Sequence, residues 1–406
     1  MSLGHTGQTF VRIVAIAALT FTGAAPAIQF EFDYGDGITG TLNTVVTAGA
    51  AIRTQDRSRE LVGKANNNPN VCGGANQSCQ GLFKEQNHPG AALAAGIGQA
   101  SSNADNGNLN YDKGDLTQAP FKVTQDLSLN YGDYGFFAKW LYFYDFVNND
   151  FTETHPNRVT AENRDRTGIT GDLTGANLLF DRVYGPGELV REQRTNSEVL
   201  RQIGTDLQLF DVYFYGRLPL GEEKELSFKV GRQTINWGES TVLVINSINQ
   251  VNAVNVNNLF RVGFDLSELF TPSNMVFLST EPFENATIEA FYGLEWEPVE
   301  IPAPGGYYSF ADIGSNNAVD SAMITFGGGA EDHDICPTGL NPDSGCGRQL
   351  NNSLAGLTNT STRIQRLADN EPDGMGQFGV SLKYFAEALG NGTEFGFYFL
   401  NYHSKL

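Results

Sequence analysis

The most distinctive arrangement of chemical groups in the sequence lies between residues 227 and 260. Residues 230–240 read VGRQTINWGES and supply a cation, an indole and a carboxylate in Arg232, Trp237 and Glu239. Asparagines then follow branched aliphatic residues at intervals of three, at Asn246, Asn249, Asn252 and Asn255. This interval fits neither a strand nor an α-helical stripe, which drifts by about 60° per step. It favours an extended or threefold turn that presents uncharged amides together, and an ordinary loop with chance spacing is the equal alternative.

Candidate catalytic and metal-binding groups are few elsewhere. The five histidines are scattered, and none has the spacing of a metal ligand set. His403 and Ser404 would point to opposite faces of a strand, so they cannot form a catalytic dyad there. The acidic residues 331–334 and the Asn- and Asp-rich residues 103–115 offer oxygen ligands, but neither matches an EF-hand. We expect no enzyme and no cofactor, with Ca²⁺ in these acidic loops as a weaker alternative to simple solvation.

The four cysteines form two local pairs within stretches rich in Gly, Asn, Pro and Asp. An even number of cysteines in an exported chain suggests disulfides that close small loops. We therefore predict the bridges Cys72–Cys79 and Cys336–Cys346. A zinc site is the weaker alternative because neither pair has C-x2-C spacing and His333 is the only nearby imidazole.

The composition excludes several classes of protein. With 26 basic and 46 acidic residues the chain has a net charge of 26 − 46 = −20, which argues against a nucleic acid as partner. Aromatic residues make up 11% of the chain, too many for a disordered protein. The body of the sequence has no run of 18 apolar residues, so a helical membrane protein is excluded. A large β-rich protein remains.

Several segments alternate apolar and polar residues with the period of a two-faced strand. In residues 121–131 the odd positions are mostly apolar, while the even positions include Lys122 and Asp126. Residues 136–147 and 286–297 behave in the same way, and residues 207–217 break the pattern at Asp211, which suggests a bulge. In all, the sequence predicts about nine strands, at residues 38–53, 121–131, 135–147, 204–218, 225–237, 273–281, 286–297, 376–386 and 393–404.

The lengths of the connections alternate between long and short throughout the chain. Outer-membrane barrels have this asymmetry, with tight periplasmic turns and long extracellular loops, whereas a soluble sandwich gives no reason for it. We therefore expect an all-β fold, an antiparallel transmembrane β-barrel. A single-chain bacterial barrel has an even number of strands, so nine indicate an incomplete barrel that continues beyond Leu406.

Bilayer physics assigns the two faces of such strands. The apolar set should contact lipid, and the polar set should line the lumen. The predicted pore-lining residues are Lys122, Asp126, Lys139, Asp145, Glu289 and Glu295. Within the barrel, residues 238–272 are expected to fold inward as a plug or constriction, with candidates Arg232, Trp237, Glu239, Asn246, Asn249 and Asn252.

The N-terminus resembles an export signal. Arg12 precedes the apolar residues 13–21, and Ala25-Pro26-Ala27 resembles a cleavage site. We therefore assign residues 1–27 to a signal peptide and residues 28–406 to one barrel domain.

Several motifs resemble the family of proteins of unknown function DUF1302 from Gram-negative bacteria. They are GRQTINWGES at residues 231–240, LEWEP at 294–298, GQFG at 376–379 and FYFLNYHS at 397–404. The resemblance implies an outer-membrane barrel, often encoded beside RND-type exporters that move hydrophobic compounds, and implies no catalytic residue. Members often place Pro and Asp where this chain has Ala253-Val254-Asn255, which leaves the role of that position open.

Together these observations predict a non-enzymatic protein of the Gram-negative outer membrane, in contact with its lipid and with an RND-type exporter system as partner. It would act as a channel or acceptor for hydrophobic compounds, a preference that comes from the family resemblance alone. One alternative is a porin for polar or anionic polymers, which would need rings of Lys and Arg in the lumen. Another is a soluble secreted β-protein that binds glycans.

Overall fold

The computed structural model of the chain describes all nine predicted strands and parts of their connections. The described residues are 14–17, 27–35, 37–68, 94–99, 104–105, 107–158, 188–221, 224–238, 247–311, 321–323, 363–365 and 368–405. The predicted disulfide residues Cys72, Cys79, Cys336 and Cys346 lie outside them, and so do Glu239 and Asn246.

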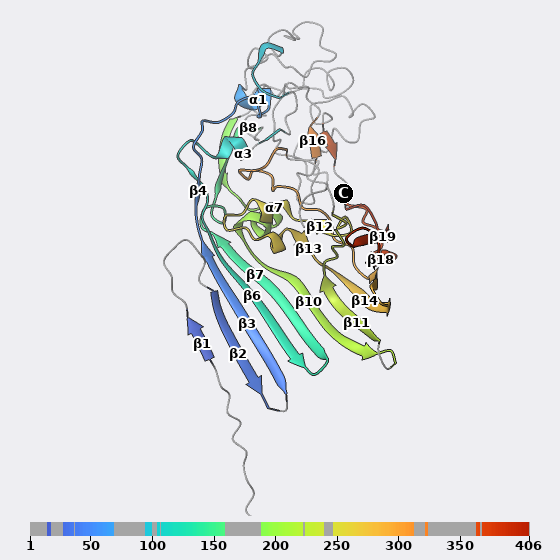
Figure 1. Ribbon diagram of the computed structural model, residues 1–406. Helices are drawn as coiled ribbons and strands as arrows, with labels where there is room; N and C mark the ends of the chain where they lie inside the picture. Colours follow the sequence, from blue (N-terminus) through green and yellow to red (C-terminus); the bar gives the residue numbers. More distant parts are fainter. Residues whose placement is uncertain are drawn as a thin grey trace, which may run out of the picture.

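One large antiparallel sheet of eleven strands dominates the molecule (Figure 1). Each strand pairs with the strands that precede and follow it along this sheet, so spatial order follows chain order. The strands are β1 (Val14–Ala17), β2 (Ala27–Tyr34), β3 (Ile38–Ala48), β6 (Pro120–Tyr131), β7 (Tyr134–Asp145), β10 (Thr205–Pro219), β11 (Glu225–Gln233), β14 (Ser273–Phe283), β15 (Ala286–Gly293), β18 (Phe378–Ala386) and β19 (Thr393–Asn401). The fold is therefore mostly β, as the alternation predicts.

All nine predicted strands are present, and β1 and β2 add to them. Strand β2 also alternates apolar and polar residues. Ile28 and Phe30 point to one face of the sheet, and Gln29 and Glu31 point to the other. It pairs with β3 along its whole length, from Ala27 opposite Val45 to Tyr34 opposite Ile38. The prediction missed this strand because it lies directly after the proposed cleavage site. Strand β1 falls within the segment assigned to the signal peptide and pairs with β2.

The connections alternate as the sequence predicts. Short turns join β2 to β3, β6 to β7, β10 to β11, β14 to β15 and β18 to β19. Each of these turns has a residue with a left-handed backbone, for example Gly132 with φ 57° between β6 and β7 and Asn285 with φ 62° between β14 and β15. The long connections carry the smaller elements β4 (Ala51–Ile52), α1 (Lys64–Asn67), α3 (Gly107–Asn110), β5 (Leu116–Gln118), β8 (Thr152–Arg158), β9 (Glu188–Gln193), α6 (Ser197–Val199), the π-helix at Leu200–Gly204, β12 (Ala253–Val254), α7 (Val256–Leu259), the 3-10 helix at Leu266–Glu268, β13 (Phe270–Thr271), β16 (Ser321–Met323) and β17 (Arg363–Gln365).

The two faces of the sheet differ in chemistry. Paired residues of neighbouring strands share a face, and the register places Lys122, Lys139 and Tyr213 on one face, which we call the covered face. The other, the open face, carries large apolar side chains that remain exposed. Examples are Phe121 (38%), Tyr131 (58%), Leu207 (61%), Leu209 (57%), Phe214 (46%), Val230 (43%), Tyr292 (44%), Val380 (44%), Phe397 (62%) and Phe399 (59%).

Strand β10 carries the bulge that the sequence predicts at Asp211. Its register against β7 shifts between Leu209 and Val212, so Phe210 and Asp211 have no opposite residue. Phe210 is buried on the sheet. In the described part of the chain, no helix has the length and apolar character needed to cross a membrane.

Candidate functional site

The candidate site is the covered face of the sheet together with residues 247–272, which we call the inserted segment. This segment contains β12, α7, the 3-10 helix and β13, and it lies beside the upper ends of β6, β7 and β10 in Figure 1. It belongs to the long connection between β11 and β14. The sequence predicted a plug at residues 238–272.

Local hydrogen bonds fix the two turns of helix in the inserted segment. The Asn255 side chain accepts from the backbone N–H groups of Asn257 (3.0 Å) and Asn258 (3.3 Å), which caps α7. Asp265 and Glu268 form a capping box around the 3-10 helix. Polar side chains that cap the helix starts thus explain why this Asn-rich segment forms two short helices.

A buried ion pair joins the inserted segment to the sheet. Lys122 on β6 donates to both carboxylate oxygens of Glu268, at 2.9 Å and 2.8 Å, and to the carbonyl of Gly263. The two charged side chains are only 3% and 1% exposed. Thr124 donates to the same carboxylate at 3.3 Å. Lys122 thus lies on the predicted face, where it binds the inserted segment.

Further polar contacts join the inserted segment to β7 and β10. Lys139 donates to the Ser267 hydroxyl at 2.5 Å. The amide of Asn258 donates to Gln208 on β10 at 3.0 Å and to the Glu268 carbonyl at 3.0 Å. The inserted segment is therefore attached at several separate points.

Arg261 is the cation of the inserted segment, and it is buried. Its guanidinium lies 3.5 Å from the ring centroid of Phe143 and donates to the carbonyl of Gln202 at 2.9 Å and to Asn258 at 2.5 Å. Burial lowers the pKa of Arg261 to about 10, against the raising influence of Glu268 and other acids nearby. It remains a cation at neutral pH and borders a cavity of about 30 Å³ with Asp145, Asn148 and Tyr307.

The regularly spaced asparagines that the structure describes, Asn249, Asn252 and Asn255, are buried. Asn252 donates to the carbonyls of Ile235 (2.6 Å) and Asn249 (3.1 Å) and accepts from the Ile235 N–H (3.0 Å). Both of its amide hydrogens are thus engaged. Asn257 bonds to Ile301 and Ala303 in a similar way. These amides therefore hold the segment in shape, a role that the repeat alone did not indicate.

Trp237 anchors an apolar cluster on the other half of the covered face. Its ring lies 5.6 Å from that of Phe291 and 6.1 Å from that of Tyr398, measured between centroids. The buried members are Ile235, Trp237, Val251, Met275 and Phe291. Val251 brings the inserted segment to β14 and β15, so Trp237 serves as a packing residue at the predicted position.

Arg232 and two glutamates form a separate charged group at the ends of β11 and β15. Arg232 contacts Glu295 at 3.0 Å and Glu297 at 2.7 Å. Glu295 also accepts from the backbone N–H of Asn274 at 2.9 Å. Burial raises the pKa of Glu297, and the hydrogen bond from Arg232 opposes this shift. Glu295 and Arg232, predicted separately, therefore come together.

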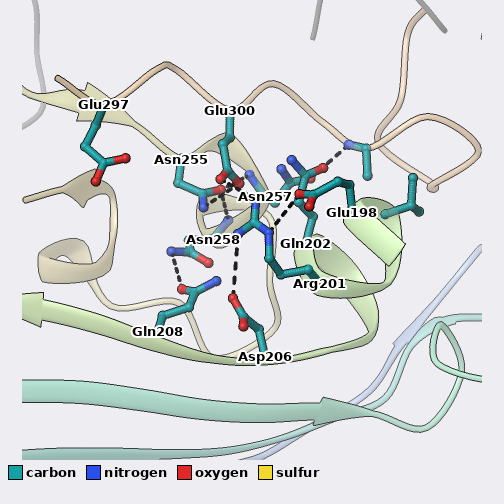
Figure 2. A network of polar contacts seen from close by, with 12 residues as sticks. Glu198, Arg201, Gln202, Asp206, Gln208, Asn255, Asn257, Asn258, Glu297 and Glu300 are labelled. Carbon is teal, nitrogen blue, oxygen red and sulfur yellow. Dashed lines mark hydrogen bonds and ion pairs between the residues drawn. The ribbon is translucent and has the colours of Figure 1, made fainter. Parts of the chain in front are cut away.

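A second network, centred on Arg201, was missed by the sequence analysis (Figure 2). Arg201 contacts Glu300 at 2.6 Å, Glu198 at 3.0 Å and Asp206 at 3.7 Å. Burial alone would lower the pKa of Arg201, but Glu300 and Glu198 raise it above its usual value. Glu300 also accepts from Asn255 at 3.0 Å. Only the Glu198–Arg201 spacing was readable from the sequence, because the other partners come from distant connections.

Of the remaining predicted pore-lining residues, Asp126, Lys139 and Glu289 lie on the covered face, and Asp145 lies at the end of a strand. Asp126 and Lys139 are opposite one another on the covered face, and Glu289 lies on the same face between Ser279 and Ser381. Asp145, at the end of β7, accepts from the backbone N–H groups of Ala119, Val147 and Asn148. Asp145 is thus a loop-fixing residue. Within the described residues, no group of His, Cys, Asp and Glu is arranged to hold a metal ion.

The half of the covered face nearer the short turns carries aromatic rings. Tyr213 lies 5.4 Å from Phe137 and 6.0 Å from Tyr215 between centroids. The Lys229 ammonium lies 5.2 Å from the ring centroid of Tyr213 and 5.8 Å from that of Phe277. The sequence analysis did not single out this group, although Lys229 alternates with apolar neighbours in its strand.

Comparison with known proteins identifies the family of the chain. No curated protein and no solved structure matches the chain. The family model described as "Protein of unknown function (DUF1302)" matches residues 9–406, which include the sheet, the inserted segment and both charged networks. The chain therefore belongs to the DUF1302 family.

Proposed function

We propose that this protein is an outer-membrane β-barrel of a Gram-negative bacterium that serves as a channel or acceptor for hydrophobic compounds, without covalent chemistry. The observation that carries the proposal is the exposed apolar open face, which runs across the sheet from β2 to β19. In water such a large apolar surface would promote aggregation, whereas the acyl chains of a bilayer would cover it.

The few polar groups on the open face support a lipid environment. Gln125 on β6 donates to Thr44 at 3.0 Å and accepts from the indole N–H of Trp140 at 3.0 Å. Polar groups in hydrocarbon must bond to one another because no water is present. These three side chains satisfy that requirement within the sheet.

The position of the inserted segment supports a constricted interior. Under the proposal the covered face lines the lumen, and the inserted segment narrows it at the end with long connections. The contacts from Lys122, Lys139 and Asn258 attach it to the wall. We infer that it is a fixed constriction and that solutes pass between it and the remaining wall.

The proposal that the transported compounds are hydrophobic rests on the family resemblance and on the aromatic rings of the covered face. An RND-type exporter is the partner that we propose from the resemblance. A porin for anionic polymers is less well supported because Lys122, Lys139 and Arg261 are engaged with protein groups. A soluble glycan-binding protein would leave the open face in water.

Heat-modifiable migration tests the architecture. We expect the protein, extracted from outer membranes with detergent, to migrate faster in a gel before boiling than after boiling, because a closed barrel stays compact in dodecyl sulfate. Its presence in the membrane fraction after alkaline washing is the accompanying control. Recovery of a monodisperse protein without detergent would instead favour the soluble alternative.

A further inference from the structure

We propose that Lys229 and the aromatic rings beside it form a binding site for an amphipathic anion, a molecule with a hydrocarbon body and a single anionic head group such as a long-chain carboxylate. This inference rests on the proposed function, because it treats the covered face as the wall of the lumen. It adds a substrate class that the fold alone does not give.

The Lys229 charge lies between two aromatic rings. Its ammonium lies over Tyr213 on one side and Phe277 on the other, on the neighbouring strands β10 and β14. Within the described part of the chain it makes no hydrogen bond or ion pair, and its side chain is exposed. Asp211 is within its electrostatic reach, but Lys139 acts on that carboxylate more strongly. Lys229 therefore retains ammonium hydrogens for a ligand.

Lys229 differs from the other lysines of the covered face. Lys122 is buried against Glu268, and Lys139 donates to Ser267. Lys383 on β18 is also on the covered face, because it is two positions from Ser381. The residues opposite it on the neighbouring strands, Thr287 and Gly396, have no aromatic ring. Lys229 thus combines a free cation with an aromatic wall.

Aromatic rings provide an apolar surface next to the Lys229 ammonium. The rings of Phe137, Tyr213 and Tyr215 continue along β7 and β10 toward the short turns, and Tyr215 is held by a hydrogen bond to Asn130 at 2.5 Å. Phe277 packs on the Trp237 cluster. An alkyl chain can lie on these rings while its head group meets the ammonium, because a charge-assisted hydrogen bond gains strength beside apolar surface.

Photolabelling of the full-length protein in phosphatidylcholine liposomes tests the site. The probes are hexadecanoic acid with a diazirine in its chain and the methyl ester of the same acid. We expect the acid to label peptides of β10 and β11 more strongly than the ester does. Substitution Lys229→Met should lower labelling by the acid about tenfold, the change expected for loss of one charge-assisted hydrogen bond.

Matched variants make the result specific. Labelling by the ester should not change in Lys229→Met, Lys229→Arg should restore labelling by the acid, and Lys383→Met should leave it unchanged. Phosphatidic acid with the same diazirine chain distinguishes a membrane lipid from a free carboxylate as the natural source. Equal labelling by acid and ester, or labelling that survives Lys229→Met, would overturn the proposal. Heat-modifiable migration of the same samples tests the barrel separately.

Discussion

At the scale of single residues, the covered face is joined to the inserted segment by a charge pair whose partners come from distant parts of the chain. Lys122 and Glu268 are separated by 146 positions and are almost fully buried together. Removing two charges from water is costly, and their attraction offsets that cost only when both are present and well bonded. The pair therefore contributes more to the position of the inserted segment than to overall stability.

Breaking this pair should loosen the inserted segment. Glu268→Gln leaves the Lys122 ammonium buried without a counter-charge, a change that typically costs about 3–5 kcal/mol. We expect faster hydrogen exchange at residues 256–270 and a lower midpoint of thermal unfolding.

The double variant Lys122→Met/Glu268→Leu provides the control for this prediction. It removes both charges and should recover much of the lost stability, because no unpaired charge remains. If Glu268→Gln alone exchanged at the rate of the native protein, the ion pair would have no part in holding the segment.

At the scale of elements, the strands could be predicted from the sequence, whereas the structure of the inserted segment could be predicted only in part. Alternation predicted nine strands and the interruption at Asp211, because the period of two survives whatever the strand packs against. It could not reveal that the Asn252 amide binds the backbone of Ile235, since that contact depends on folding across 17 positions. The Arg201 network depends on similar long-range contacts.

The contribution of the α7 cap to the free energy of unfolding can be measured separately. Asn255→Ala removes the acceptor for the N–H groups of Asn257 and Asn258 and the bond to Glu300. We expect a loss of about 1 kcal/mol from the cap alone. Urea unfolding in detergent measures the change.

Asn255→Ser separates the two functions of this side chain. The serine hydroxyl keeps a cap acceptor but removes the amide that donates to Glu300, so an intermediate loss is expected. Equal stability of Asn255→Ala and the native protein would show that the cap is not needed.

At the scale of the whole molecule, the two faces of the sheet must experience different surroundings. Leu127 and Ser128 are adjacent on β6 and point to opposite faces, so they form a matched pair. Under the proposed function Leu127→Arg places a cation in hydrocarbon, at a cost of about 2–4 kcal/mol near the bilayer midplane. Ser128→Arg places the same cation on the covered face.

We expect Leu127→Arg to lower the yield of heat-modifiable protein after refolding into liposomes, and Ser128→Arg to fold nearly as well as the native chain. The yields are compared at equal protein concentration. Equal loss in both variants would contradict the assignment of the open face to lipid.

The agreement between strand order in the sheet and order in the chain has a consequence for biogenesis. Each pair of strands joined by a short turn can form as an independent hairpin, because closing a short loop is fast. The inserted segment must wait, since Glu268 follows β11 in the chain and needs Lys122 on β6. Because the segment contacts both β6 and β10, its docking requires that two earlier hairpins, β6 with β7 and β10 with β11, already lie side by side.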